Sequence, residues 1–102
     1  MYNVITSASF EKDLDNIIKY FINSLNSKNA AVHLLDRTEE ITSHISENPY
    51  MYPVYHDKKI TEREYHYSVI GNFILFYTIN EINKTVVLSR LLYGRRYIPE
   101  II

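Results

Sequence analysis

The stretch SFEKDLDNIIKYFINSL, residues 9–25, carries the strongest periodic signal in this sequence. Its apolar side chains recur every three or four residues, so on a helix they form one continuous stripe. Ser7 or Ser9 can cap the start of this helix, and Glu11 and Asp13 lie near its positive end. The stretch therefore predicts an amphipathic helix. The residues of its stripe are Phe10, Leu14, Ile17, Ile18, Phe21, Ile22 and Leu25.

A second amphipathic helix follows the polar break NSLNSKN, residues 23–29, which suits a tight turn and a new helix cap. Pro49 ends this second pattern. Two helices joined by so short a turn form an antiparallel hairpin, which we expect to span roughly residues 7–48. The face of the second helix that we expect to be buried consists of Ala31, Leu34, Leu35, Thr38, Ile41 and Ile45.

The second half of the chain changes from helical spacing to a period of two. Tyr65, Tyr67 and Val69 face one way, and the residues between them face the other. Gly71 and Asn72 then form a two-residue hairpin signal, because both tolerate positive φ. The pattern predicts an antiparallel hairpin at this point.

Two more strands complete the predicted sheet. Residues 73–79, FILFYTI, are almost wholly apolar, as expected for a central strand covered on both faces. Residues 80–84 turn the chain, and Thr85–Tyr93 forms the last strand. At the other end of the chain, residues 2–6 read as a short opening strand.

These elements predict an α+β fold in the order strand, helix, helix, three-strand meander. The helix hairpin packs on one face of a mainly antiparallel sheet, and the other face is expected to be open to a ligand. Residues 1–102 suffice for one domain with one core. The pairing of the first strand does not follow from the sequence. The residues that we expect in the core are Leu14, Ile18, Phe21, Leu35, Ile41, Phe76 and Leu88.

Composition excludes several classes of protein. The chain has 46% hydrophobic and 23% charged residues, a net charge of −1 and no cysteine. A general nucleic-acid binder is more basic than this. We expect a cytoplasmic protein, because no secretory signal or apolar run of about 20 residues is visible. The histidines lack metal-ligand spacing, so neither a metal nor a cofactor is predicted.

The most unusual local feature is SRLLYGRRY, residues 89–97, where a strand ends at a glycine and two arginines follow. The guanidinium groups of Arg95 and Arg96 suit a phosphate, a phosphorane-like transition state or a carboxylate of a protein partner. Tyr93 and Tyr97 flank the pair and can stack on a base or donate a proton. The alternative interpretation is an ordinary solvated turn with surface arginines.

Two further candidates lie before the predicted meander. His66 is on the strand face opposite Tyr65 and Tyr67, where it can act as a general acid or base or can simply lie at the surface. Arg63 belongs to a basic cluster with Lys58 and Lys59, a composition also typical of a solvated loop.

The order of elements and the closing motif together resemble the RelE/ParE superfamily, the toxins of bacterial type II toxin–antitoxin modules, which are also called plasmid stabilisation or addiction modules. The resemblance runs almost from end to end. It implies the strand–helix–helix–meander fold, growth inhibition, and a cognate antitoxin that wraps the toxin and blocks its active surface. The segments that carry it are SFEKDLDNIIKYF, AAVHLLDRTEEI, NPYMYPVY, IGNFILFYTI and VVLSRLLYGRRY.

The superfamily divides on mechanism. RelE-like members cut messenger RNA on the ribosome, and they usually place an arginine on the third strand, where this chain has Ile74. ParE-like members poison DNA gyrase and often show His-Gly-Arg-Arg-Asp where this chain has Tyr-Gly-Arg-Arg-Tyr, residues 93–97. The long helix hairpin and the net charge of −1 favour the ParE-like branch, since binding a polyanion such as the ribosome calls for a basic surface.

Three functions remain open from the sequence. The first is a toxin that binds gyrase without catalysis. The second is a ribosome-dependent endoribonuclease with Arg95, Arg96, Tyr97 and His66 around the scissile phosphate. The third is a decayed toxin that only binds its antitoxin and co-regulates transcription. In each case, the residues that we expect to contact the target or the antitoxin are Arg63, Arg90, Tyr93, Arg95 and Arg96.

Overall fold

The computed structural model describes residues 1–56 and 63–94. Within them the chain forms a strand, two helices and three further strands, as the sequence predicts. The elements are β1 (Asn3–Thr6), α1 (Ala8–Lys19), a π-helical turn η1 (Tyr20–Ser24), α2 (Lys28–Glu47), a 3-10 turn η2 (Pro49–Met51), β2 (His66–Ile70), β3 (Phe73–Asn80) and β4 (Thr85–Tyr93).

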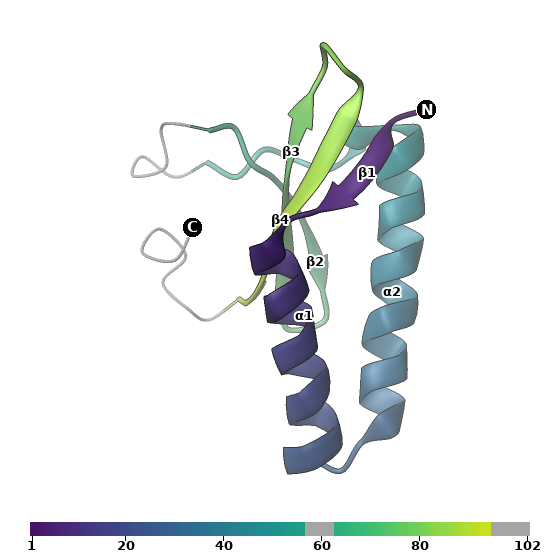
Figure 1. Ribbon diagram of the computed structural model, residues 1–102, viewed down its shortest axis with the longest axis vertical. Coiled ribbons are helices and arrows are strands. Elements are labelled where there is room, and N and C mark those ends of the chain that lie inside the picture. Colours follow the sequence, from purple (N-terminus) through teal and green to yellow (C-terminus); the bar gives the residue numbers. More distant parts are fainter. Residues whose placement is uncertain (57–62, 95–102) are drawn as a thin grey trace.

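The four strands form one mixed sheet in the order β1-β4-β3-β2. The three-strand meander is antiparallel as predicted, with Ile70 opposite Phe73 and Phe73 opposite Tyr93. β1 pairs with β4 in parallel, with Asn3 opposite Thr85. The first strand is therefore an edge strand beside the last one (Figure 1).

The two helices lie side by side, antiparallel to one another, and cover one face of the sheet (Figure 1). Ser7, and not Ser9, caps α1 by accepting the N–H of Phe10 at 3.0 Å, and Ser27 caps α2 in the same way. The helix face of the sheet holds the main core. Its buried members are Phe10, Leu34, Ile41, Ile45, Ile70, Leu75, Tyr77, Val86, Leu88 and Leu91.

One expected core residue is wrong: Leu35 is 44% exposed. At 100° per residue, Leu35 lies about 80° from the centre of the buried stripe of α2, so its side chain reaches the edge of that stripe. Leu14, Ile18 and Phe21 are partly buried against the core, and Ile41, Phe76 and Leu88 are buried as expected. The apolar pattern thus predicted the position of the buried face of α2 correctly but predicted that face to be wider than it is.

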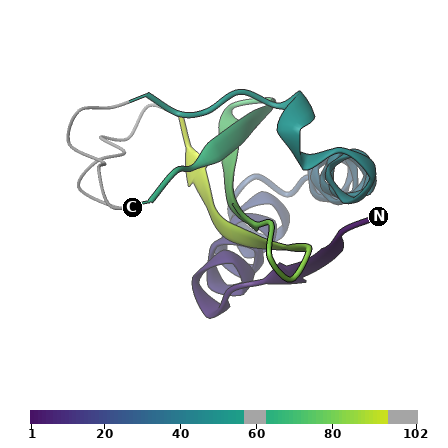
Figure 2. The ribbon, with the colours of Figure 1, turned by 90° about the horizontal axis from the view of Figure 1, so that it is seen from above.

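The opposite face of the sheet carries a second, smaller cluster that the sequence did not predict. Tyr65, Phe76 and Leu92 are buried there. The ring of Tyr55 packs on Phe76 with centroids 5.1 Å apart. The segment after η2 passes along the side of the sheet away from α1 (Figure 2). The expectation of an open second face is therefore wrong at this position, because part of the chain covers it.

A β-bulge interrupts the pairing of β3 with β4. Tyr77 lies opposite Leu88, but its neighbour Phe76 lies opposite Arg90, so Ser89 has no partner position on β3. The extra residue shifts the alternation of side chains by one. Leu88 and Leu91 consequently both belong to the core under the helices, although they are three residues apart.

Candidate functional site

The predicted site begins where β4 ends. Tyr93 is 38% exposed, and the N–H of Gly94 donates to the carbonyl of Asn72 at 2.9 Å, which holds the strand end against the β2–β3 turn. A Cβ on Gly94 would lie 3.5 Å from Cδ1 of Ile74. Arg95, Arg96 and Tyr97 lie outside the described residues, so their roles stay predictions.

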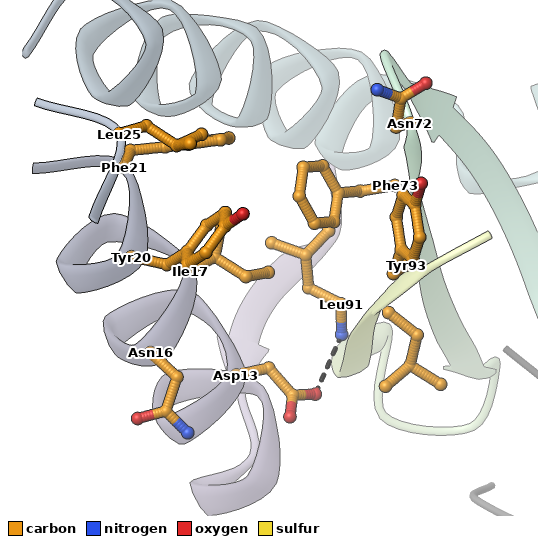
Figure 3. A pocket seen from close by; sticks show the side chains of 11 residues that line it. Asp13, Asn16, Ile17, Tyr20, Phe21, Leu25, Asn72, Phe73, Leu91 and Tyr93 are labelled. Atoms are coloured by element: carbon orange, nitrogen blue, oxygen red, sulfur yellow. Dashed lines mark hydrogen bonds between the residues drawn. The ribbon is translucent and has the colours of Figure 1, made fainter. Parts of the chain in front are cut away.

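A groove of about 570 Å³ opens beside this strand end, between α1 with its π-helical turn and the ends of β3 and β4 (Figure 3). Its walls are mainly apolar and aromatic. Phe73 lies between Phe21 and Tyr93, with ring centroids 6.0 and 5.9 Å away. Asp13, Asn16 and Asn72 supply polar groups at its rim. Sequence reasoning missed this groove, because its walls come from positions about 70 residues apart in the chain.

Arg90 forms an ion pair with Asp13 of α1. Its Nε and Nη2 donate to the two carboxylate oxygens at 2.7 and 2.9 Å, and the N–H of Leu91 donates to the same carboxylate at 3.0 Å (Figure 3 shows this last bond). The hydrogen bond to Asp13 raises the pKa of Arg90, against the opposing effect of burial. Part of this guanidinium is thus engaged within the chain, and a contact of Arg90 with a target or antitoxin stays a prediction.

His66 lies away from the strand end, on the helix-covered face of the sheet. It faces away from Tyr65 and Tyr67 as predicted, but it is only 5% exposed. Its Nδ1 donates to the carbonyl of Tyr52 at 2.8 Å, and its ring stacks on Tyr77 at a centroid distance of 5.4 Å. Its Nε2 lies 3.6 Å from Oε1 of Glu64.

The register separates His66 from the end of β4. His66 is level with Tyr77, whereas Tyr93 is level with Phe73, four residues away along β3. At about 3.3 Å per residue the two positions lie roughly 13 Å apart along the strands. Arg63 is exposed and precedes β2 at the His66 end. The described structure therefore does not bring His66 or Arg63 together with Tyr93.

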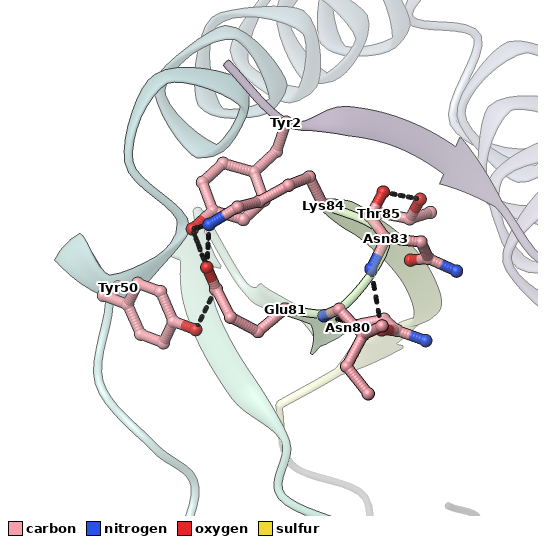
Figure 4. A network of polar contacts seen from close by, with 8 residues as sticks. Tyr2, Tyr50, Asn80, Glu81, Asn83, Lys84 and Thr85 are labelled. Atoms are coloured by element: carbon pink, nitrogen blue, oxygen red, sulfur yellow. Dashed lines mark hydrogen bonds and ion pairs between the residues drawn. The ribbon is translucent and has the colours of Figure 1, made fainter.

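A cluster of polar side chains holds the opposite end of the β3–β4 hairpin (Figure 4). The carboxylate of Glu81 accepts hydrogen bonds from Tyr50 at 2.6 Å and from Tyr2 at 2.8 Å, and it pairs with Lys84. These partners, Lys84 first, lower the pKa of Glu81 to about 2. The same contact raises the pKa of Tyr50 to about 12. The cluster joins the start of the chain, η2 and the β3–β4 turn.

Within residues 1–56 and 63–94, no group of three or more histidine, aspartate or glutamate side chains is arranged to hold a metal ion. In the same residues, none of the helices has the length and apolarity needed to cross a membrane.

Comparisons with solved structures agree on the fold. The chain superimposes on a metal-bound toxin from Helicobacter pylori with a TM-score of 0.64, at 21% identity over 91% of this chain and 94% of that one. The toxin–antitoxin complex RelBE2 from Mycobacterium tuberculosis gives a TM-score of 0.59, at 19% identity over 90% and 96% of the chains. An archaeal RelE–RelB complex from Pyrococcus horikoshii gives 0.55, at 15% identity over 93% and 97%.

Comparisons of sequence identify the family. No curated protein sequence matches the chain. The family described as "ParE toxin of type II toxin-antitoxin system, parDE" matches residues 4–97, which is nearly the whole chain and includes every described strand and helix apart from Asn3 of β1. The protein therefore belongs to the ParE toxin family, within the RelE/ParE toxins of type II toxin–antitoxin systems.

Proposed function

We propose that this toxin acts in the cytoplasm by binding DNA gyrase without catalysing a reaction, and that a cognate antitoxin neutralises it. The arginine pair after Gly94 makes the contact with gyrase, and the end of β4 presents it. Tyr93, at the rim of the groove, extends the contact surface with a half-exposed aromatic ring.

The observation that carries this proposal is the surroundings of Gly94. A ribonuclease needs an acid, a base and cations around the phosphorus. The side chain nearest to Gly94 on β3 is Ile74, at the position where RelE-like nucleases usually have an arginine. Ile74 packs with the apolar cluster of Phe76 and Leu92 and can neither transfer a proton nor balance a charge.

The position of His66 supports the same proposal. The imidazole is buried, its Nδ1 proton is donated to the carbonyl of Tyr52, and it lies roughly 13 Å along the strands from Tyr93. A general base has to reach the reacting group within hydrogen-bond distance. His66 therefore contributes to packing of the sheet, and the gyrase-binding proposal has no need of it.

The test combines two assays of the purified full chain. Inhibition of gyrase supercoiling is expected, together with unchanged messenger RNA ends in a translating extract. Arg95→Ala/Arg96→Ala should lower the inhibition by well over tenfold, because each charge-assisted contact contributes about 1.5–3 kcal/mol. Lys19→Ala/Arg37→Ala is the matched control, since it removes two exposed cations from the helices.

Other outcomes would identify the other functions. Cleavage of messenger RNA at codon-defined positions would contradict gyrase binding and favour the nuclease, with Arg95, Arg96, Tyr97 and His66 in the catalytic roles. Full activity of His66→Gln in that assay would remove His66 from the set. No effect in either assay would favour a decayed toxin that binds only its antitoxin.

The antitoxin is the second proposed partner. Two of the structures that share this fold are named as toxin–antitoxin complexes. We propose that an acidic segment of the antitoxin lies near Arg90–Tyr97 and sets its carboxylates against Arg95 and Arg96. Affinity for the antitoxin should fall in Arg95→Ala/Arg96→Ala and stay unchanged in Lys19→Ala/Arg37→Ala. Equal affinity of wild type and the first variant would contradict this placement.

A further inference from the structure

We propose that Asp13 is a positioning residue, which fixes the second half of β4 to α1 so that the strand end at Tyr93 and Gly94 is held in place for the target. The inference rests on the proposed function only for the identity of that target. Asp13 itself need not touch gyrase, because its carboxylate is occupied by Arg90 and by the backbone of Leu91.

β4 changes its neighbour halfway along its length. Up to Leu88 its outer side is paired with β1. Beyond Leu88, where β1 has ended, residues at the start of α1 make the hydrogen bonds to the outer side of β4. The N–H of Ser7 donates to the carbonyl of Leu88 at 3.0 Å, and Oγ of Ser7 donates to the carbonyl of Ser89 at 2.9 Å. Asp13 then accepts the N–H of Leu91.

The bulge makes this half of the strand depend on α1. Bulges locally disrupt the ladder and bend the strand, and here Ser89 is left without a partner position on β3. Arg90 follows the bulge directly, and its guanidinium returns to Asp13 through two parallel hydrogen bonds. Such a fork fixes direction as well as distance, because both partners are planar.

The ion pair between Asp13 and Arg90 is mostly buried. The side chains of Asp13 and Arg90 are only 14% and 23% exposed, so water and salt screen this pair less than an exposed one. Asp13 lies one turn after the buried Phe10 and two turns after the Ser7 cap, on a well-anchored part of α1. Three donors from two adjacent residues of β4 thus converge on one carboxylate of a fixed helix.

The consequence reaches Gly94. Arg95 follows Leu91 by four residues in the sequence. On the side of β4 that faces β3, the strand is held by its pairing with β3 and, at its end, by the hydrogen bond from the N–H of Gly94 to the carbonyl of Asn72. Among the residues that the structure describes, loss of the Asp13 carboxylate would remove the hydrogen bonds that hold the outer side of this half-strand beyond the bulge. The strand end at Gly94 would then be held less firmly.

Amide hydrogen exchange of the full chain tests the structural half of the inference directly. In Asp13→Ala the amides of Leu92 and Gly94 should exchange at least about tenfold faster than in wild type, with the amide of Tyr77 unchanged. Asp15→Ala is the matched control, because Asp15 lies on the same helix and, within the described part of the chain, pairs with the exposed Lys19 alone. Unchanged exchange at Leu92 and Gly94 would overturn the proposal.

Growth arrest on induced expression tests the functional half, whichever target the toxin has. Asp13→Ala should weaken arrest by about tenfold, whereas Asp15→Ala should not. Because Asp13 acts through the arginines, adding Asp13→Ala to Arg95→Ala/Arg96→Ala should cause no further loss. Additive losses would overturn the proposal, since they would indicate a general loss of folded protein.

Two further outcomes separate this inference from the proposed function. Growth arrest without inhibition of gyrase supercoiling would show that gyrase is not the target. The hydrogen-exchange and growth-arrest tests of Asp13→Ala would remain valid. If wild type causes no arrest, the exchange experiment decides alone. Asp13→Asn serves where Asp13→Ala fails to fold: it keeps an acceptor for the N–H of Leu91, loses the charge facing Arg90, and should give intermediate values in both measurements.

Discussion

The two ends of β4 are each held by one carboxylate, and the two carboxylates work under opposite conditions. Near Thr85, Glu81 is exposed and gathers Lys84 and the phenols of Tyr2 and Tyr50. Near Tyr93, Asp13 is mostly buried and binds Arg90 together with a backbone amide.

The difference in exposure indicates that the contacts of Asp13 stabilise the fold more than those of Glu81. Water around Glu81 weakens its ion pair and competes for its hydrogen bonds, so an exposed cluster of this kind contributes little. Asp13 has less access to water. Its removal takes two hydrogen bonds from the guanidinium of Arg90 and the acceptor from the N–H of Leu91. The Glu81 cluster anchors a turn, whereas Asp13 anchors a strand.

The largest expected effect comes from removing the buried member of this comparison. Asp13→Ala should lower the free energy of unfolding by about 2–3 kcal/mol, because charge-assisted hydrogen bonds are lost in a partly buried place. Urea denaturation at neutral pH measures it. Asp15→Ala, which loses an exposed pair with Lys19, should cost less than about 0.5 kcal/mol. Equal losses in the two variants would show that burial does not separate them.

A smaller effect is expected at the start of α1, where the helix first replaces β1 beside β4. Ser7 and Ser27 both cap a helix, but only Ser7 also donates to β4, at the carbonyl of Ser89. Ser27→Ala should cost about 1 kcal/mol, as a lost cap, and Ser7→Ala about 1 kcal/mol more, as a lost hydrogen bond. The same urea titrations compare them. Identical costs would indicate that the bond to Ser89 adds nothing.

The smallest effect is expected from Glu81→Gln, and it should depend on pH. The pKa of Glu81 is about 2 in the folded chain, below its ordinary value of 4.5, so the folded state binds this proton less readily. Its contribution is fully present above pH 4.5 and is lost as the pH falls toward 2. The stability difference between wild type and Glu81→Gln should shrink across this window. A constant difference from pH 6 to pH 2 would contradict the shift.

The sequence predicted the elements well because periodicity is a local property. The stripe from Phe10 to Phe21, the polar break and the alternation after Tyr65 each follow from neighbours within a few residues. The prediction that β3 is covered on both faces of the sheet was also correct. Leu75 and Tyr77 are buried on the helix face, and Phe76 is buried on the opposite face. Leu35, at the margin of its stripe, was assigned wrongly, and Ile22 and Leu25 at the end of the first stripe are exposed as well.

What the sequence missed depends on contacts between distant residues. No local pattern distinguishes Asp13 from Asp15, two acidic residues on one helix, yet only Asp13 meets β4. The parallel pairing of β1 with β4 and the cover that Tyr55 gives Phe76 likewise join remote segments. His66 was placed on the right face, but its burial under Tyr52 and beside Tyr77 needed the fold.

The bulge at Ser89 also determines how this chain tolerates changes in length. Deletion of Ser89 would remove the bulge and leave the later pairs in register, with Arg90 still opposite Phe76. A residue inserted directly after Arg90 would instead turn the later side chains of β4 to the opposite face. Leu92 would then point toward the helices and Leu91 away from them. An insertion on the far side of Gly94 would disturb none of these contacts. We therefore expect homologues to vary in length after Gly94, to have or lack the single bulge residue between Leu88 and Arg90, and to keep the number of residues between Arg90 and Gly94 constant.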